Sequence, residues 1–161
     1  MPTLKDLKHK PLYIFGYISG YIDGEGCFSV SFSKRQKIKI GWETKPSLSV
    51  SQNEDRAQIL YLMKEIFGCG FLRRDYSDKT LKYEIRKLDD LVNKVIPFLD
   101  KYPLISKKCK EFESFRKICF LMKKEAHLSK RGFKKIIKIA FQMNPSGKRK
   151  YSLNEVIKSL S

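Results

Sequence analysis

The sequence predicts an α+β domain with the element order αββαββα and extra helices at the C-terminus. Two segments alternate strictly between apolar and polar residues, as half-buried strands do, and two further β-type segments follow the next helix-like segment. No internal repeat or low-complexity linker divides the 161 residues, a length usual for one domain. This order is typical of a four-stranded antiparallel sheet with helices on one face and the other face free.

The first hairpin follows an apolar helix that is predicted over residues 12–24. Residues 27–33 form a predicted strand, because Phe28, Val30 and Phe32 alternate with serines. The alternation returns at residues 47–51. The basic segment between the two is expected to form a hairpin tip and a returning strand that breaks near Pro46.

A second helix and hairpin are predicted after this sheet segment. Residues 53–68 form the helix, with Asn53 as its N-cap and Gly68 at its end. Strands are then expected over 70–76 and 81–87, and helices over 89–100, 106–126, 130–141 and 152–160.

The chain is predicted to be a single domain, 1–161, with an N-terminal arm (1–11), a core (12–126) and a helical tail (127–161). The arm lacks the apolar core of a secretory signal. No run approaches the ~20 apolar residues of a membrane-spanning helix. The four cysteines lack zinc-like spacing and are expected to be reduced.

The charge of the chain indicates a polyanionic partner. Lys and Arg number 34 against 17 Asp and Glu, which gives a formal net charge of +17. Nucleic acid and an anionic membrane surface both fit this excess, and a solvated basic surface is the simpler alternative. A membrane surface is disfavoured, because no helix clearly pairs a lysine face with an aromatic insertion face.

The predicted first helix carries glycines on one face. Gly16, Gly20 and Gly24 are four residues apart, so they lie together and allow another backbone to come close. The sequence contains one such helix, so its natural partner is the same helix of a second copy across a two-fold axis.

Such a dimer would bring two copies of Glu25 together at the helix ends. Two neighbouring carboxylates repel each other unless a cation lies between them, and hard oxygen ligands favour Mg²⁺. The simpler interpretation is a glycine-rich helix end with solvated acids at Asp23 and Glu25.

The stretch "ISGYIDGEG", residues 18–26, resembles the signature of the LAGLIDADG homing endonucleases, of the single-motif, homodimeric type. Three further segments resemble this family in the same order along the chain: "SLSVSQNEDRAQILYLMKEIFGCG", "PFLDKYPLISKKCKEFESF" and "HLSKRGFKKIIKIAFQMN". One departure is Glu25, where many members carry Asp. Both acids occur in the family.

The resemblance implies an intron-encoded, site-specific endonuclease that hydrolyses both strands of DNA with Mg²⁺. Mn²⁺ is expected to substitute, and Ca²⁺ to bind without cleavage. The implied partner of the homodimer is a pseudo-palindromic duplex of about twenty base pairs, in the prokaryotic cytoplasm or an organelle matrix. A non-cleaving RNA-binding intron maturase is the alternative, although Glu25, Gln52 and Lys108 favour the nuclease. Half of a larger fused protein is a third possibility, which the tail segment disfavours.

The resemblance also assigns roles by position. Glu25 and the Gly24 carbonyl would bind metal, and Gln52 would hold the attacking water. Arg56 and Lys108 would supply positive charge near the cleaved phosphate, with Lys107 as a rival for the second role. The dimer interface would contain Gly16, Gly20, Gly24 and Asp23, the last capping or orienting the partner helix.

The free sheet face would lie as a saddle on the DNA and read base edges in the major groove. Its outward residues are expected to be Ser29, Ser31, Ser33, Arg35, Ser47, Ser49, Ser51, Arg73, Lys82, Glu84 and Arg86. Lys34, Lys37 and Lys39 at the hairpin tip would touch phosphates, as would the tail lysines Lys134, Lys135, Lys138 and Lys148 unless these are solvated. An ordinary polar sheet face is the alternative.

Overall fold

The computed structural model describes residues 11–145 and 147–160, which fall into two compact units. Of the described residues, those within Met1–Cys27 and Ser47–Cys109 form the first unit. Those within Phe28–Pro46 and Lys110–Ser161 form the second. The expected N-terminal arm lies outside the described residues except for its last residue, Pro11.

The four predicted strands form one antiparallel sheet, which confirms the α+β class. The strand order is β1-β2-β4-β3, so β2 and β4 are the interior strands. The strands are β1 (Gly26–Lys34), β2 (Trp42–Asn53), β3 (Phe71–Asp75) and β4 (Thr80–Ile85). The inward positions Phe28 and Val30 of β1 are buried, as the alternation predicts.

Strand β2 is longer than expected, because it continues through Pro46 instead of breaking there. Proline lacks a backbone N–H and is tolerated where one side of a strand has no ladder partner. The register with β4 runs from Leu48 to Asn53 and does not include Pro46. The missing donor therefore interrupts no hydrogen bond to β4.

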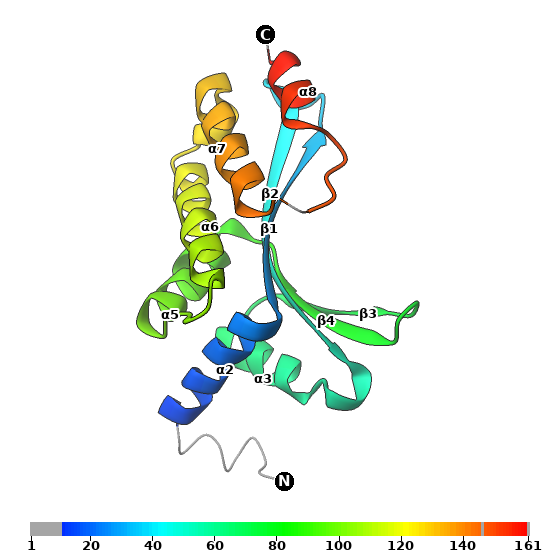
Figure 1. Cartoon of the computed structure of the whole chain (residues 1–161), viewed down its shortest axis with the longest axis vertical. Helices are drawn as coiled ribbons and strands as arrows, with labels where there is room; N and C mark the ends of the chain where they lie inside the picture. The colour runs from blue at the N-terminus through cyan, green and yellow to red at the C-terminus, as the bar shows by residue number, and fades with distance from the viewer. Residues whose placement is uncertain (1–10, 146, 161) are drawn as a thin grey trace. The chain divides into compact units, whose positions relative to one another are not determined.

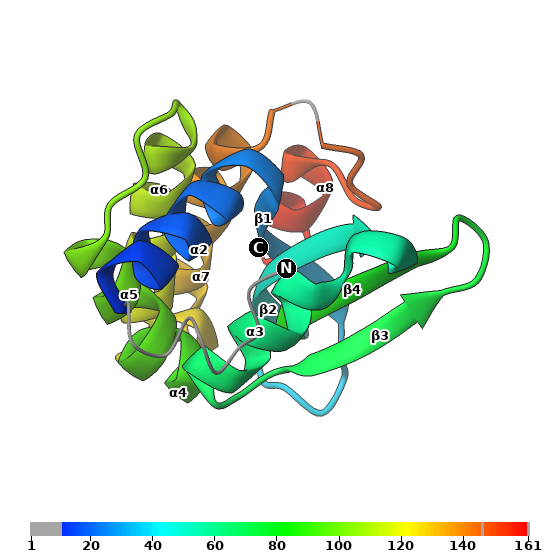
Figure 2. The same ribbon diagram turned by 90° about the horizontal axis from the view of Figure 1, so that it is seen from below.

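The first unit contains α2 (Pro11–Glu25) and α3 (Gln58–Phe67), and α3 covers one face of the β3–β4 hairpin (Figures 1 and 2). The predicted N-cap was wrong. Asn53 makes no side-chain capping bond and precedes a short 3-10 turn, Glu54–Arg56, before α3 begins. The predicted end is confirmed, since Gly68 has φ 60° and its N–H donates to Lys64 O.

The helical segments after β4 form in the predicted places, with an unpredicted π-helical stretch in the first of them. The bounds are α4 (Leu88–Asp90), η2 (Leu91–Val95, π-helical), α5 (Ile96–Lys101), α6 (Lys108–Lys123), η3 (Ala126–Leu128), α7 (Lys130–Met143) and α8 (Leu153–Lys158). Ser152 caps α8 in a capping box with Glu155.

The second unit packs its helical tail on an aromatic core. Trp42 of β2 is buried with Phe133, Ile137, Val156 and Leu160. The indole N–H of Trp42 donates to Ser159 Oγ at 2.9 Å, which ties β2 to the residue after α8. The tail is therefore part of a packed core.

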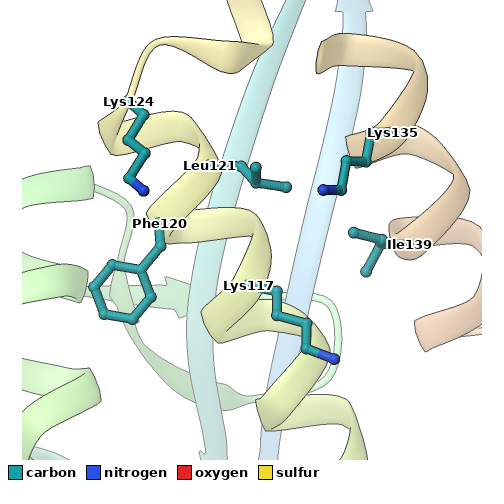
Figure 3. A pocket seen from close by; sticks show the side chains of 6 residues that line it. All are labelled: Lys117, Phe120, Leu121, Lys124, Lys135 and Ile139. Carbon is teal, nitrogen blue, oxygen red and sulfur yellow. The ribbon is translucent and has the colours of Figure 1, made fainter. Parts of the chain in front are cut away.

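A shallow hollow lies between α6 and α7 in this unit (Figure 3). Its floor is apolar, and lysines stand at its edge. The lining residues are Lys117, Phe120, Leu121, Lys124, Lys135 and Ile139. None of the six carries a carboxylate or an imidazole, so the hollow is no candidate for metal binding or acid–base chemistry.

All four cysteines are free thiols, and Cys119 is buried. Within residues 11–145 and 147–160, no helix combines the length and apolar character needed to cross a membrane.

Candidate active site

The candidate site lies at the C-terminal end of α2 in the first unit. Glu25 is the last residue of this helix and is exposed, and β1 begins at Gly26. A Cβ atom on Gly26 would lie 2.5 Å from Ile22 O. A glycine is therefore required for the helix to pass directly into the strand, and this passage leaves the Glu25 side chain at the surface.

Lys108, the first residue of α6, reaches this helix end. Its Nζ donates to the carbonyl oxygens of Ile22 at 3.4 Å and Gly24 at 3.3 Å, and also to Gly26 O. These carbonyls lie at the negative end of the helix dipole, where a cation is stabilising. Lys107 is exposed. The structure thus brings Lys108, and not its rival, to the backbone on either side of Glu25.

Asp23 has partners within its own chain. Its carboxylate accepts hydrogen bonds from Ile105 N at 3.1 Å, from Ser106 N at 2.9 Å and from Ser106 Oγ at 2.5 Å. Desolvation raises the pKa of Asp23, but the hydrogen bonds from Ser106 and Ile105 and the charge of Lys108 outweigh it and hold the pKa below its usual value. Asp23 therefore ties α2 to the residues that precede α6.

Asp23→Asn is expected to destabilise the chain by about 1 kcal/mol at pH 7, because an amide accepts these bonds less strongly than a carboxylate. Because the pKa of Asp23 is lower in the folded chain than in the unfolded chain, its ionised carboxylate stabilises the fold. This stability is fully present above the pKa of an aspartate in the unfolded chain, near 3.9, and is lost as the pH falls through the pKa of Asp23 in the folded chain. The difference between parent and variant should therefore shrink below about pH 4. Urea unfolding at pH 7 and pH 3.5 measures it.

The matched control for this variant is Asp55→Asn. Asp55 is exposed and lies 3.7 Å from Arg56 in a surface ion pair, which contributes little to stability. An equal loss of stability in both variants would contradict the capping role of Asp23.

Gln52 is held against the last turns of α2. Its Nε2 donates to the hydroxyl of Tyr21, and its Oε1 accepts from Asn53 N at 2.8 Å. Tyr21 precedes Glu25 by four residues, so both lie on the same helix face. The structure therefore brings Gln52 to within one helical turn of Glu25.

Arg56 is not held at the helix end in the same way. It lies in the turn before α3, its side chain is 69% exposed, and Nε lies 3.7 Å from Asp55 Oδ2. The sequence interpretation missed Tyr21 and Ser106, which position Gln52 and Asp23. The four-residue spacing from Tyr21 to Glu25 was the available signal for the first, and no local pattern marked the second.

The outward sheet face of the first unit follows the register of three strands. Ser49 lies opposite Glu84, and Glu84 opposite Phe71. In the next row Ser51 lies opposite Lys82, and Lys82 opposite Arg73. The expected set is thus on one face, but it is less open than predicted: Ser47, Ser49 and Glu84 are 8%, 9% and 7% exposed. Because β2 and β4 are interior strands, neighbouring side chains flank these residues.

In the second unit an unpredicted acid organises the polar residues of β1 and β2. Glu43 pairs with Arg35, lies 3.0 Å from Lys45 Nζ, and accepts a hydrogen bond from Ser33 at 3.4 Å. The hydrogen bond from Lys45 and the nearby positive charges lower the pKa of Glu43 despite desolvation. Arg35 is thus partly neutralised.

The other predicted positions of this unit lie at or near its surface. Lys34 Nζ lies 5.4 Å from the centre of the Tyr151 ring. Ser29 and Lys134 are half-buried, whereas Ser31, Lys37, Lys39, Lys135, Lys138 and Lys148 are exposed. These positions are available to phosphates without being arranged into a site.

The glycine face of α2 is open. A Cβ atom added to Gly16, Gly20 or Gly24 would meet no atom within 4 Å outside the helix itself. Each interior glycine costs a helix about 1 kcal/mol relative to alanine. No contact of the described chain therefore accounts for these glycines.

No complete metal site exists within residues 11–145 and 147–160, because no three side chains of the His, Cys, Asp and Glu types lie together. Within one copy of the chain, Glu25 supplies a single carboxylate to the end of α2. The Gly24 carbonyl beside it already accepts from Lys108.

Comparison with known proteins identifies the family. The LAGLIDADG endonuclease family model matches residues 18–119, which contain the C-terminal half of α2, the four strands and most of α6. The chain belongs to the LAGLIDADG endonuclease family. Homing endonuclease I-ApeII of Aeropyrum pernix is 32% identical to this LAGLIDADG chain over 149 residues, which cover 89% of the chain and 87% of that protein.

Solved LAGLIDADG structures share the fold. The archaeal intron-encoded homing endonuclease I-Vdi141I, complexed with DNA, has a TM-score of 0.86 and 31% identity, and the match covers 94% of this chain and 96% of that one. The homing endonuclease I-TnaI has a TM-score of 0.80 and 34% identity, with 91% and 95% covered.

Several LAGLIDADG relatives are much longer. Probable intron-encoded endonuclease 3 of Neurospora crassa is 32% identical over 127 residues, which cover 78% of this chain and 24% of that protein. The chain spans 24% to 28% of the length of four such relatives.

Proposed function

We propose that this chain is a site-specific homing endonuclease that hydrolyses both strands of a DNA target as a homodimer. The observation that carries the proposal is the exposed Glu25 at the end of α2, with Gln52 and Lys108 held around the same helix end. The similarity to I-ApeII over most of both chains supports the reaction class.

The dimer is supported by the surface around the glycine face. Apolar side chains beside it are strongly exposed: Ile105 is 94% exposed, Leu12 75% and Tyr13 61%. A groove joins Gly16 and Gly20 to the segment before α6, lined also by Ser19, Asp23, Lys101, Tyr102, Pro103, Leu104 and Ile105. Exposed apolar surface next to a backbone without side chains is suited to close packing of two helices. The partner is a second copy of this face.

The donor set fits Mg²⁺ only when two copies meet. Each copy would contribute the Glu25 carboxylate and, through the second lone pair of its oxygen, the Gly24 carbonyl that also accepts from Lys108. Hard oxygen donors suit Mg²⁺, with Mn²⁺ as a substitute. Ca²⁺ is expected to bind without supporting cleavage. When bound, such an ion supplies Lewis-acid stabilisation of charge on the reacting phosphate.

The roles of the chain's own groups follow from their places. Lys108 holds positive charge beside the reacting phosphate while it secures the end of α2. Gln52, whose amide donates to Tyr21, would hold the attacking water. Arg56 and Lys107 are exposed, and they would have to turn toward bound DNA to add positive charge.

The outward sheet face would read a pseudo-palindromic duplex of about twenty base pairs, matching the two-fold symmetry of the dimer. An origin within an intron is supported by the intron-encoded relatives. The expected place of action is the prokaryotic cytoplasm or an organelle matrix, where intron-bearing DNA is found.

The function can be tested on supercoiled plasmids that carry candidate insertion sites without the intron. With Mg²⁺, only the plasmid that carries the true insertion site should be converted to linear product. In EDTA, no plasmid should be cut. Cleavage of all plasmids alike would contradict site specificity, and product in EDTA would contradict metal dependence.

A further inference from the structure

Three side chains form a cluster: Phe71 of β3, Glu84 of β4, and Arg86, which directly follows β4. The Nη2 of Arg86 donates to Glu84 Oε2 at 2.9 Å, and the Arg86 guanidinium carbon lies 5.2 Å from the centre of the Phe71 ring. The Glu84 side chain is only 9% exposed, whereas that of Arg86 is 54% exposed. We call Phe71, Glu84 and Arg86 the arginine cluster. Its base is buried, and its tip faces outward.

The cluster fixes the orientation of Arg86. A free arginine side chain loses rotamer entropy when it binds, and the loss is smaller when the side chain is already held in place. Here a buried carboxylate holds one edge of the guanidinium and an aromatic ring lies against its carbon atom. The bond to Glu84 uses one of its five N–H donors. The remaining donors can make the bidentate contact with guanine O6 and N7.

Phe71 presents an apolar ring on a polar sheet face, beside the Arg86 guanidinium. It shares this face with Arg73 because the two are two residues apart on β3, yet 39% of its surface is exposed. The methyl group of thymine is the apolar group that a base pair presents in the major groove. An exposed ring among hydrogen-bonding side chains is suited to that contact.

The spacing allows adjacent base pairs to be read together. Phe71 and Glu84 are direct partners across two neighbouring strands, which lie about 5 Å apart. Successive base pairs are separated by about 3.4 Å. Both Arg86 and Phe71 can therefore face neighbouring base pairs.

We propose that the arginine cluster reads a thymine next to a guanine in each half-site, with Arg86 donating to the guanine and Phe71 contacting the thymine methyl. Glu84 is a positioning residue that acts through Arg86. This assignment rests on the proposed DNA-cleaving function and names a base step that the sheet recognises.

The test begins with the sites that the parent chain selects and cleaves from a randomised pseudo-palindromic duplex library. A thymine next to a guanine is expected at one place in each half-site. Uracil, which lacks only the methyl group, is then substituted for that thymine, and binding is measured in Ca²⁺. The parent should bind the uracil-containing target about fourfold more weakly than the thymine-containing target, the effect of one buried methyl group. The Phe71→Ala variant should bind the two targets with equal affinity.

Two further variants separate the roles within the cluster. Arg86→Ala should lose the preference for guanine over adenine, a preference of about 5- to 150-fold. Glu84→Gln should reduce that preference while the response to uracil stays, a combination that general loss of structure does not produce. Tyr76→Ala is the matched control, because Tyr76 is an exposed ring on the same hairpin that lies 5.8 Å from the Arg74 guanidinium. It should keep the parental response to both substitutions.

The proposal is overturned if Phe71→Ala responds to uracil as the parent does, or if the selected sites have no thymine beside a guanine. If the parent cleaves no duplex in the library, the proposed endonuclease function is overturned together with the proposed role of the arginine cluster. If the parent cleaves a target that has no thymine next to a guanine, only the proposed role of the arginine cluster is overturned.

Discussion

Glu25→Gln should abolish DNA cleavage and leave DNA binding intact. The substitution keeps the size of the side chain and removes the negative charge that a metal ion at the end of α2 requires. Loss of an ion that contributes several kcal/mol of transition-state stabilisation should lower the rate by about a thousandfold or more. Glu25 is exposed at the end of its helix, so the fold should be unchanged. Plasmid linearisation with Mg²⁺ measures the rate.

Binding provides the independent readout for this variant. A carboxylate that faces a phosphate repels it, so the variant with a neutral amide in its place should bind the target as tightly as the parent or more tightly when EDTA is present. The matched control is Glu113→Gln, which removes an exposed acid from α6 and should cut at the parental rate. Parental cleavage by Glu25→Gln would disprove the metal-binding role.

The sequence predicted the strands of the sheet because alternation is a local signal. Phe28 and Val30 are buried and Ser31 is exposed as the period of two requires. The path of β2 through Pro46 was not predictable in the same way, because whether a proline is tolerated depends on which neighbouring strand is present at that point. The same dependence on packing explains why α3 begins after Asn53, although that residue is a favourable N-cap by type.

The site was predictable in part for a similar reason. Glu25 lies within the motif, and the helix end that it occupies follows from the glycines around it. The partners of Asp23 lie 82 and 83 residues away along the chain, and no local pattern specifies such a contact. Phe71 could have been predicted. It lies two residues before Arg73 in a predicted strand, and side chains two residues apart on a strand share a face.

Gly20→Leu should convert the protein to a monomer and thereby abolish double-strand cleavage. A side chain at this position would block the close approach of the second helix, and overpacking a close contact costs about 1–3 kcal/mol or more. Within the chain itself a Cβ atom on Gly20 meets nothing within 4 Å outside the helix, and leucine is the better helix former. The thermal stability of the monomer should therefore not fall. Sedimentation at micromolar concentration, with and without target DNA, measures the assembly.

A parallel loss of dimer and of cleavage activity, without a loss of thermal stability, distinguishes a blocked interface from a general loss of structure. Gln142→Leu adds the same exposed side chain to α7, which belongs to the second unit and carries none of the three glycines, and should leave both the dimer and cleavage intact. Because each copy supplies one Glu25, a monomer holds half of the proposed carboxylate pair, and activity should fall in parallel with the dimer fraction. A parent that sediments as a monomer on DNA, or a Gly20→Leu variant that remains dimeric and active, would contradict the proposed interface.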